Sequence, residues 1–199
     1  NYSIQGINLL DEIGIPLNEN KAFSHLESIG RTGIIWRGQC RVDGITPDIA
    51  EKAKESGCIA MGLGVESVSQ KSLDMINKRI TVSKARETIT LLKKNDIEAR
   101  IYMIMGLPGE PEDITERTWR FIQESQPDLV YLSLFTARPG TQVYKKPKEF
   151  GLKYIDTTWE NTMHMYGRYE HEIPTLTFEY EEQAPWGKSR DKETIVNEY

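Results

Sequence analysis

The sequence predicts an α/β fold built on a parallel β-sheet, for three reasons. Short apolar runs alternate with helical patterns up to about residue 145. The connections between them are short, which favours parallel strands joined by right-handed crossovers. The run Ile97–Met105 is apolar enough to be covered on both faces, as strands of a parallel sheet are. A doubly wound sheet and part of a barrel both satisfy this periodicity.

Five apolar runs define the predicted strands, each short enough for a strand. In chain order they are residues 7–10, 33–36, 59–63, 97–105 and 129–135. The helix after the first strand is predicted from a single apolar face, formed by Ala22, Phe23, Leu26 and Ile29.

Capping residues mark the helices that follow the later strands. Thr46 supplies a capping hydroxyl before Pro47, which suits the first helical turn. Ser69 is predicted to begin a short helix and Thr81 a longer one. The last helix of the series should begin near Glu112, whose charge suits the positive end of the helix dipole.

Length and composition limit the class of protein. The 199 residues are enough for one sizeable core, or one domain with a tail. No apolar run approaches the roughly 20 residues of a membrane span, so we expect a soluble protein. A net charge of −5 argues against a nucleic-acid partner. Cys40 and Cys58 form no metal-ligand pattern and favour a reducing, cytoplasmic compartment. Since the first residue is Asn1, we expect the natural start to lie upstream.

Glycine, acidic and arginine residues gather just after the predicted strands. In chain order these segments are residues 11–12, 37–41, 62–67, 106–110 and 138–141. In a β/α barrel the loops at the carboxyl ends of the strands share one face, and that face holds the chemistry. Glycine there permits positive φ and a close approach of the backbone to a ligand. We therefore expect these segments to converge on one rim.

The segment Gly62–Ser67 has three interpretations. It carries two glycines of the dinucleotide-binding fingerprint, but it lacks the third glycine and an acidic residue about 20 positions further on. A structural interpretation is a tight strand-to-helix turn with Glu66 as an N-terminal cap. The carboxylate could equally accept hydrogen bonds from ribose hydroxyls or from an amino group.

Four motifs follow one another along roughly residues 4 to 150. They are Asp11-Glu12 with Asn18, Gly62–Ser67 with Asn77-Lys78-Arg79, Tyr102–Glu110, and Arg138-Pro139-Gly140-Thr141 with Tyr144. Because these four motifs occur in this order, the chain resembles the radical S-adenosylmethionine superfamily. The resemblance is to the branch that contains methylthiotransferases and cobalamin-binding members such as the anaerobic cyclase. The first motif resembles the paired acids of cobalamin-type members. The other three look like the fourth-, fifth- and sixth-strand motifs of that branch.

The resemblance implies a partial six-stranded β/α barrel, similar to a TIM barrel, whose first strand is missing from this chain. Residues 1–150 would form the barrel, and residues 151–199 a helical and irregular C-terminal extension with a helix near residues 158–170. S-adenosylmethionine would bind across the mouth of the barrel. A [4Fe–4S] cluster, held by three cysteines after the first strand, would cleave it to a 5′-deoxyadenosyl radical. That three-cysteine loop is absent, and we expect the chain to begin between the first and second strands.

The resemblance also implies roles for individual residues. Glu66 and Ser67 would face the ribose or the methionine part, and Arg79 would bind the cofactor carboxylate through its planar guanidinium. Gly106 and its neighbours would let the adenine lie against the backbone. Asp11 would lie near the amino group or the substrate. The complete predicted set of cofactor-binding residues is Asp11, Gly62, Gly64, Glu66, Ser67, Arg79, Met105, Gly106, Leu107, Glu110 and Arg138.

The predicted function is therefore that of a radical enzyme core that oxidises, cyclises or methylates a small organic molecule. The cluster ligands, and any cobalamin, would belong to upstream segments, so this chain alone should neither assemble the cluster nor catalyse. Two alternatives remain, a β/α barrel that binds a phosphate or sugar and a non-catalytic scaffold. The missing first strand leaves the sheet edge near residues 7–10 unpaired, and we expect the tail or a second chain, as in a dimer, to cover it.

Overall fold

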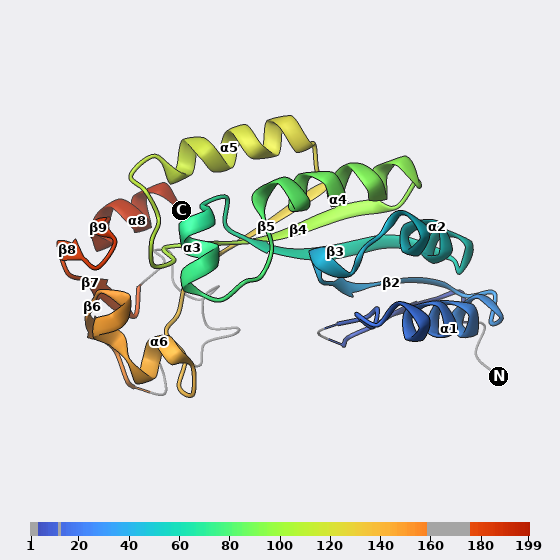
Figure 1. Cartoon of the computed structure of the whole chain (residues 1–199), viewed down its shortest axis with the longest axis horizontal. Helices are drawn as coiled ribbons and strands as arrows, with labels where there is room; N and C mark the ends of the chain where they lie inside the picture. The colour runs from blue at the N-terminus through green and yellow to red at the C-terminus, as the bar shows by residue number, and fades with distance from the viewer. Residues whose placement is uncertain (1–3, 12, 159–175) are drawn as a thin grey trace.

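The computed structural model describes residues 4–11, 13–158 and 176–199. At its centre is a sheet of five parallel strands in which neighbours along the chain are also neighbours in the sheet. The strands are β1 (Gly6–Asn8), β2 (Ile35–Cys40), β3 (Cys58–Glu66), β4 (Glu98–Met105) and β5 (Leu129–Leu134). The sheet curls into half of a barrel (Figure 1). The predicted α/β fold, a partial barrel of parallel strands, is therefore confirmed.

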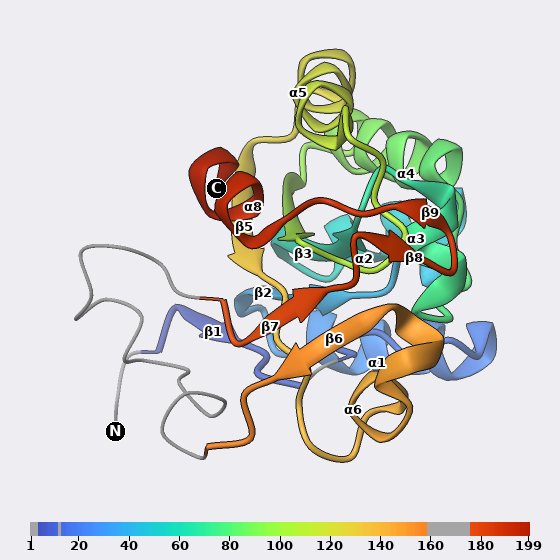
Figure 2. The same ribbon diagram turned by 90° about the vertical axis from the view of Figure 1, so that its left-hand side faces the viewer.

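Helices connect the strands and cover the outer face of the curl (Figure 2). They are α1 (Glu19–Gly30), α2 (Pro47–Glu55), α3 (Gln70–Met75), α4 (Val82–Lys94) and α5 (Ile114–Ser125), with the 3-10 helix η1 (Val42–Gly44) before α2. The core between sheet and helices includes the buried side chains of Leu26, Ile49, Leu63, Ile89 and Phe121. Burying an aliphatic or aromatic side chain of this kind contributes about 1.5–3 kcal/mol, which holds the helices against the sheet.

The predicted helix starts at Thr46, Ser69 and Thr81 are confirmed. Each hydroxyl accepts a hydrogen bond from the backbone N–H three residues further on, at 3.2, 3.2 and 3.1 Å. These bonds satisfy donors that the first helical turn leaves free. The last helix of the series begins slightly later than predicted, at Ile114.

Two strands extend further than their apolar runs suggested. Residues 37–40 lie within β2 and residues 62–66 within β3, so the prediction that they form loops after the strands was wrong. In β2 the side chain of Trp36 is buried, whereas Arg37 and Gln39 are exposed on the opposite face. Because half of a barrel leaves its inner face open, polar residues and glycines there are compatible with strand pairing.

The chain beyond β5 packs at the carboxyl ends of the strands (Figures 1 and 2). Its elements are α6 (Gln142–Lys145), η2 (Pro147–Phe150), β6 (Leu152–Ile155), β7 (Phe178–Tyr180), β8 (Gln183–Ala184), β9 (Gly187–Lys188) and α8 (Lys192–Glu198). A second hydrophobic cluster joins Met105 and Leu134 at the strand ends to Leu176, Phe178 and Ile195. The C-terminal extension is thus fixed to the end of the barrel where the predicted site lies.

Two predictions about this region are not settled. The helix near residues 158–170 falls almost wholly on residues 159–175, which lie outside the described residues. The division into a barrel of residues 1–150 and an extension of residues 151–199 stays a prediction. In the ranges that the structure describes, no helix has both the length and the apolar character needed to cross a membrane.

Candidate functional site at the carboxyl ends of the strands

Two glycines of β3 leave room for side chains on the inner face of the half-barrel. A Cβ atom at Gly62 would lie 2.5 Å from Cε2 of Tyr102. A Cβ atom at Gly64 would lie 2.6 Å from Oε1 of Glu66 and 2.9 Å from Nζ of Lys78. Real Cβ contacts are essentially never this short, so both positions require glycine as long as these side chains lie over the strand. The glycines serve side chains that cross β3, which a dinucleotide fingerprint would not require.

Glu66 and Lys78 form an ion pair over the end of β3. The distance from Nζ to Oε1 is 2.7 Å, and about a fifth of each side chain is exposed. Glu66 has a φ of 66°, beside an irregularity in the pairing of β3 with β4. Such a conformation costs on the order of 1–3 kcal/mol in a residue with a side chain, and it is concentrated at functional sites. The N-cap of α3 is Ser69, so the interpretation of Glu66 as a helix cap is wrong.

The end of α3 decides which cation reaches Glu66. Asn77 adopts the left-handed conformation with φ 55°, and the N–H of Lys78 donates to the carbonyl of Leu73 at 2.8 Å, as in a Schellman motif. The chain turns at this point, so that Lys78 meets Glu66. Arg79 is exposed, and its Nε lies 3.4 Å from Oδ1 of Asn77. The motif Asn77-Lys78-Arg79 contains Lys78, but the family resemblance implied the cofactor contact for Arg79.

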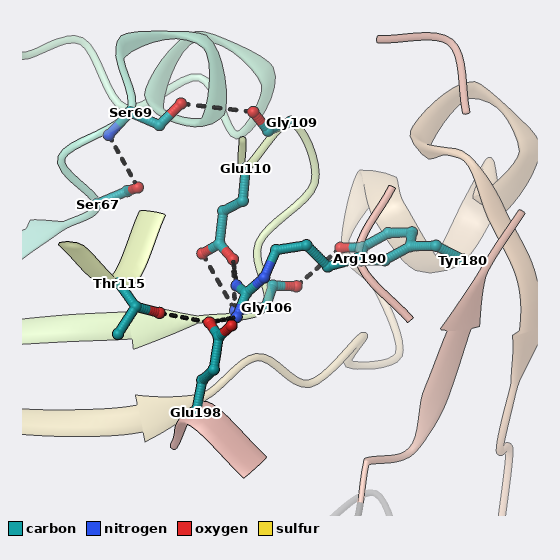
Figure 3. Close-up of polar contacts among 9 residues, drawn as sticks. All are labelled: Ser67, Ser69, Gly106, Gly109, Glu110, Thr115, Tyr180, Arg190 and Glu198. Atoms are coloured by element: carbon teal, nitrogen blue, oxygen red, sulfur yellow. Dashed lines mark hydrogen bonds and ion pairs between the residues drawn. The ribbon is translucent and has the colours of Figure 1, made fainter. Parts of the chain in front are cut away.

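The turn after β4, residues 106–110, lies against α3. Gly106 and Gly109 have φ values of 87° and 85°, which favour glycine. A Cβ atom at Gly109 would lie 2.8 Å from Sδ of Met75, and the hydroxyl of Ser69 donates to the carbonyl of Gly109 at 3.4 Å (Figure 3). The structure therefore brings the β4 turn together with the segment that carries the Glu66–Lys78 ion pair. This agrees with the expectation that these segments converge on one rim of the barrel.

A cavity of about 570 Å³ lies between the end of α3, the β4 turn, the end of β5 and α6. Its apolar lining includes Ile104, Leu107 and Phe135, and its polar lining includes Asn77 and Arg138. Pockets for small molecules typically have volumes of about 300–1,000 Å³. Leu107 and Arg138, both predicted as site residues, thus line one cavity whose wall at Asn77 adjoins the ion pair. Ile104, on the inner face of β4, lines it too and was not predicted.

Three predicted residues are engaged by the protein itself. Ser67 is 2% exposed, and its hydroxyl accepts a hydrogen bond from the N–H of Ser69 at 3.1 Å. Met105 belongs to the second hydrophobic cluster. Glu110 is 4% exposed and accepts a hydrogen bond from Nη1 of Arg190 at 2.7 Å. A contact of Ser67, Met105 or Glu110 with a cofactor stays a prediction.

Asp11 is not part of the cavity lining. It is exposed in the loop after β1, the edge strand of the sheet. Its partner in the acidic motif, Glu12, lies outside the described residues. A role for Asp11 near an amino group or a substrate stays a prediction.

The two cysteines do not fit an iron–sulfur cluster. Cys40 and Cys58 are buried free thiols, and burial raises the pKa of each to about 12. Cluster ligands are thiolates, and several must converge on one site. Among the described residues, no three His, Cys, Asp or Glu side chains form a group able to hold a metal ion. The residues that the structure describes therefore supply no ligand set for a cluster.

A family comparison identifies the origin of this arrangement. Residues 15–122 match the family model described as the radical SAM superfamily. The chain belongs to this superfamily. The matched region contains Glu66, Lys78 and the β4 turn, so the family assignment made from the sequence motifs is confirmed.

Curated relatives place the chain near methyltransferases and cyclases. It is 30% identical over 146 residues to an uncharacterized methyltransferase of Pyrococcus horikoshii, a match that covers 72% of this chain and 32% of that protein. It is 31% identical over 116 residues to the anaerobic magnesium-protoporphyrin IX monomethyl ester cyclase of Cereibacter sphaeroides, covering 57% of this chain and 19% of the cyclase. The chain thus spans a third or less of the length of these relatives.

A solved structure supports the radical SAM fold. The methyltransferase TsrM of Kitasatospora setae, determined with cobalamin and a [4Fe–4S] cluster bound, superposes with a TM-score of 0.54 at 15% identity. The superposition covers 59% of this chain and 25% of TsrM. At this identity the likeness concerns the fold alone.

Proposed function

We propose that this chain is the S-adenosylmethionine-binding half-barrel of a radical SAM enzyme. The observation that carries the proposal is the cavity of about 570 Å³ at the carboxyl ends of parallel strands, whose lining includes Asn77, the residue next to Lys78 of the ion pair with Glu66. In barrels of this kind, ligands bind at that end. The cavity has the size of a small-molecule site, and its lining combines apolar and polar groups.

The residues of this chain fit the parts of S-adenosylmethionine. Ile104, Leu107 and Phe135 offer an apolar wall to the adenine. The ammonium group of Lys78 suits the cofactor carboxylate, and the carboxylate of Glu66 suits its amino group or a ribose hydroxyl. In this proposal Lys78 takes the role that the sequence analysis gave to Arg79, because Lys78 is the cation that meets Glu66.

The reaction of the whole protein is a wider proposal. The superfamily uses S-adenosylmethionine with a [4Fe–4S] cluster; a reduced cluster would donate one electron to the sulfonium, whose C–S bond would break to give methionine and a 5′-deoxyadenosyl radical. The matched relatives include methyltransferases and a cyclase, so we propose methyl transfer or oxidative cyclisation of a small organic molecule. Cluster and cobalamin would be held by parts of the protein other than the residues described here.

We also propose a cytoplasmic location, because Cys40 and Cys58 are buried as free thiols and suit a reducing compartment. Binding of nucleic acid is not part of the proposal. The exposed edge at β1 stays a predicted dimer contact. Light scattering during size-exclusion chromatography tests it, since a monomer at every concentration would rule the dimer out.

Calorimetric binding of S-adenosylhomocysteine tests the cofactor site without needing a cluster. Lys78→Met and Glu66→Gln should each weaken binding by about 10-fold to 100-fold, the range for a hydrogen bond to a charged group. Lys94→Met is the matched control, because Lys94 is exposed at the end of α4 that leads into the amino end of β4, and it does not line the cavity.

Two further measurements separate the alternatives. Arg79→Met should leave the affinity near that of the wild type, and a loss confined to Arg79→Met would restore the role first predicted for it. Inorganic phosphate should not compete with S-adenosylhomocysteine. Tight phosphate binding without binding of S-adenosylhomocysteine would replace this proposal with a barrel that binds phosphate ligands.

A further inference from the structure

Both peptide groups of Gly106 are held by hydrogen bonds. Its N–H donates to Oε1 and Oε2 of Glu110 at 3.1 and 3.0 Å. Its carbonyl accepts a hydrogen bond from the hydroxyl of Tyr180 at 2.8 Å (Figure 3). Tyr180 is the last residue of β7, so one of these two contacts comes from the C-terminal extension.

Glu110 is itself fixed by the extension. Nη1 of Arg190 donates to its carboxylate at 2.7 Å, and both side chains are almost completely buried, at 3% and 4% exposure. Nη2 of Arg190 pairs with Glu198 of α8, and Glu198 accepts a hydrogen bond from the hydroxyl of Thr115 of α5 at 2.5 Å (Figure 3). A chain of contacts therefore runs from α5 through the extension to the backbone of Gly106.

Apolar residues of the extension complete the contact. A Cβ atom at Gly106 would lie 3.2 Å from Cγ2 of Ile195 and 3.3 Å from Cζ of Phe178. On the other side of the turn, Nζ of Lys71 in α3 donates to the carbonyl of Trp186 at 2.7 Å. The extension thus packs against the turn and is also bonded to α3.

Leu107 connects this packing to the cavity. It follows Gly106 directly and lines the cavity of about 570 Å³ together with Ile104. It also borders the small gap enclosed by Glu110, Tyr180 and Arg190. A displacement of the extension would therefore move a residue of the cavity wall.

A buried ion pair is weak evidence for stability, because desolvation of the two charges offsets most of their attraction. Its directional hydrogen bonds do fix geometry. A binding wall held in its bound conformation in advance avoids the entropy cost of ordering it when the ligand arrives. The turn after β4 has this character, since Tyr180 restrains it at Gly106 and Arg190 restrains it at Glu110.

We infer that Tyr180 and Arg190 of the C-terminal extension are positioning residues for the S-adenosyl site, an inference that rests on the proposed function. Neither side chain lines the cavity of about 570 Å³. They act through Gly106 and Glu110, which set the position of Leu107 in the cavity wall.

The test compares two hydroxyl deletions from the same extension. Tyr180→Phe removes the donor to Gly106, and Tyr199→Phe removes a hydroxyl that donates to the carbonyl of Leu132 in β5 at 3.2 Å. Affinity is measured calorimetrically with S-adenosylhomocysteine and with 5′-methylthioadenosine, which keeps the adenosine but lacks the amino and carboxylate groups. Unfolding by denaturant is measured for each variant.

Tyr180→Phe should weaken binding of both probes by about threefold to tenfold, the range for one neutral hydrogen bond. Tyr199→Phe should leave both affinities unchanged, and Lys78→Met should affect S-adenosylhomocysteine alone. If Tyr180 only stabilised the fold, the folded Tyr180→Phe and Tyr199→Phe variants would bind each probe with equal affinity, even if their free energies of unfolding differed. Wild-type affinity in Tyr180→Phe for both probes overturns the inference, whereas a wild type that binds neither probe overturns the proposed function.

A second variant tests the role of Arg190 in the buried ion pair with Glu110. Arg190→Met alone leaves Glu110 buried without its partner and can unfold the protein, so Glu110→Gln is combined with it to remove both charges. Circular dichroism checks that this double variant is folded. Its affinity for both probes should fall by at least the factor found for Tyr180→Phe, and wild-type affinity in the folded double variant would exclude Arg190 as a positioning residue.

Discussion

Replacing Gly64 with alanine should weaken ligand binding strongly while leaving the stability of the fold almost unaffected. The new Cβ atom would lie 2.6 Å from Oε1 of Glu66, which is 0.8 Å inside the 3.4 Å at which ordinary contacts begin (3.4 − 2.6). The carboxylate must move, and its 2.7 Å contact with Lys78 breaks. Oε1 of Glu66 and Nζ of Lys78 lie at the far ends of flexible side chains, so moving them costs little free energy.

The free energies of the two effects differ. A partly exposed ion pair contributes about 0–1 kcal/mol to folding. Replacing glycine by alanine recovers about 0.4–1 kcal/mol of unfolded-state entropy where the backbone permits it. We therefore expect Gly64→Ala to change the free energy of unfolding by less than about 1 kcal/mol. Affinity for S-adenosylhomocysteine should fall by about 10-fold to 100-fold, because two charged contacts are misplaced.

Gly62→Ala is the informative comparison, two positions earlier on the same strand. Its Cβ atom would lie 2.5 Å from a ring carbon of Tyr102, which stacks on Tyr131 with ring centroids 5.1 Å apart. The ring of Tyr102 is rigid and must move as a whole, so the variant loses the stacking contact with Tyr131 or overpacks the sheet. We expect the free energy of unfolding to fall by about 2–4 kcal/mol.

Denaturant unfolding measures the stability of both variants, and calorimetry measures their affinity for S-adenosylhomocysteine. The reasoning is wrong if Gly64→Ala is as unstable as Gly62→Ala. It is also wrong if Gly64→Ala binds S-adenosylhomocysteine as tightly as the wild type does.

Three further predictions follow from buried groups. Burial raises the pKa of Glu110 to about 7 in spite of Arg190, so the folded state binds a proton more tightly than the unfolded state does. Stability should therefore decline as pH rises from about 4.5 to 7, by up to about 3 kcal/mol, and Glu110→Gln should flatten this part of the curve in denaturant titrations. Ser69→Ala should cost about 1 kcal/mol in the same assay, since it removes the cap of α3, and an unchanged midpoint would contradict the cap. Incubation with iron and sulfide should give no stoichiometric cluster absorbance, because Cys40 and Cys58 are buried and protonated; a stoichiometric cluster would refute this.

The sequence predicted the sheet well because apolar periodicity reports burial against helices. It placed the ends of β2 and β3 too early, because Arg37, Gln39 and Gly62 look like loop residues. On the inner face of half a barrel, however, strand side chains are not packed against a helix layer. Periodicity along a strand therefore describes its outer face well and its inner face poorly.

Two site features depend on contacts that no local pattern encodes. Lys78, rather than Arg79, pairs with Glu66 after the left-handed residue Asn77, and our proposal gives Lys78 the cofactor contact for this reason. Glu110 lies in a motif whose family resemblance suggested a ligand contact, yet its partner is Arg190, 80 positions further along the chain. Only the folded structure shows that the extension uses this carboxylate.

The long separation between Gly106 and its partners has a consequence during synthesis. Tyr180 follows Gly106 by 74 positions and Arg190 follows Glu110 by 80. At about 5–20 residues per second, the ribosome takes on the order of ten seconds to make that stretch. The strands of the half-barrel are thus available to pair well before the β4 turn can acquire its partners. The wall of the cavity therefore acquires these contacts only after the strands are made, and a nascent protein that stops short of Arg190 would have the sheet without the ion pair at Glu110.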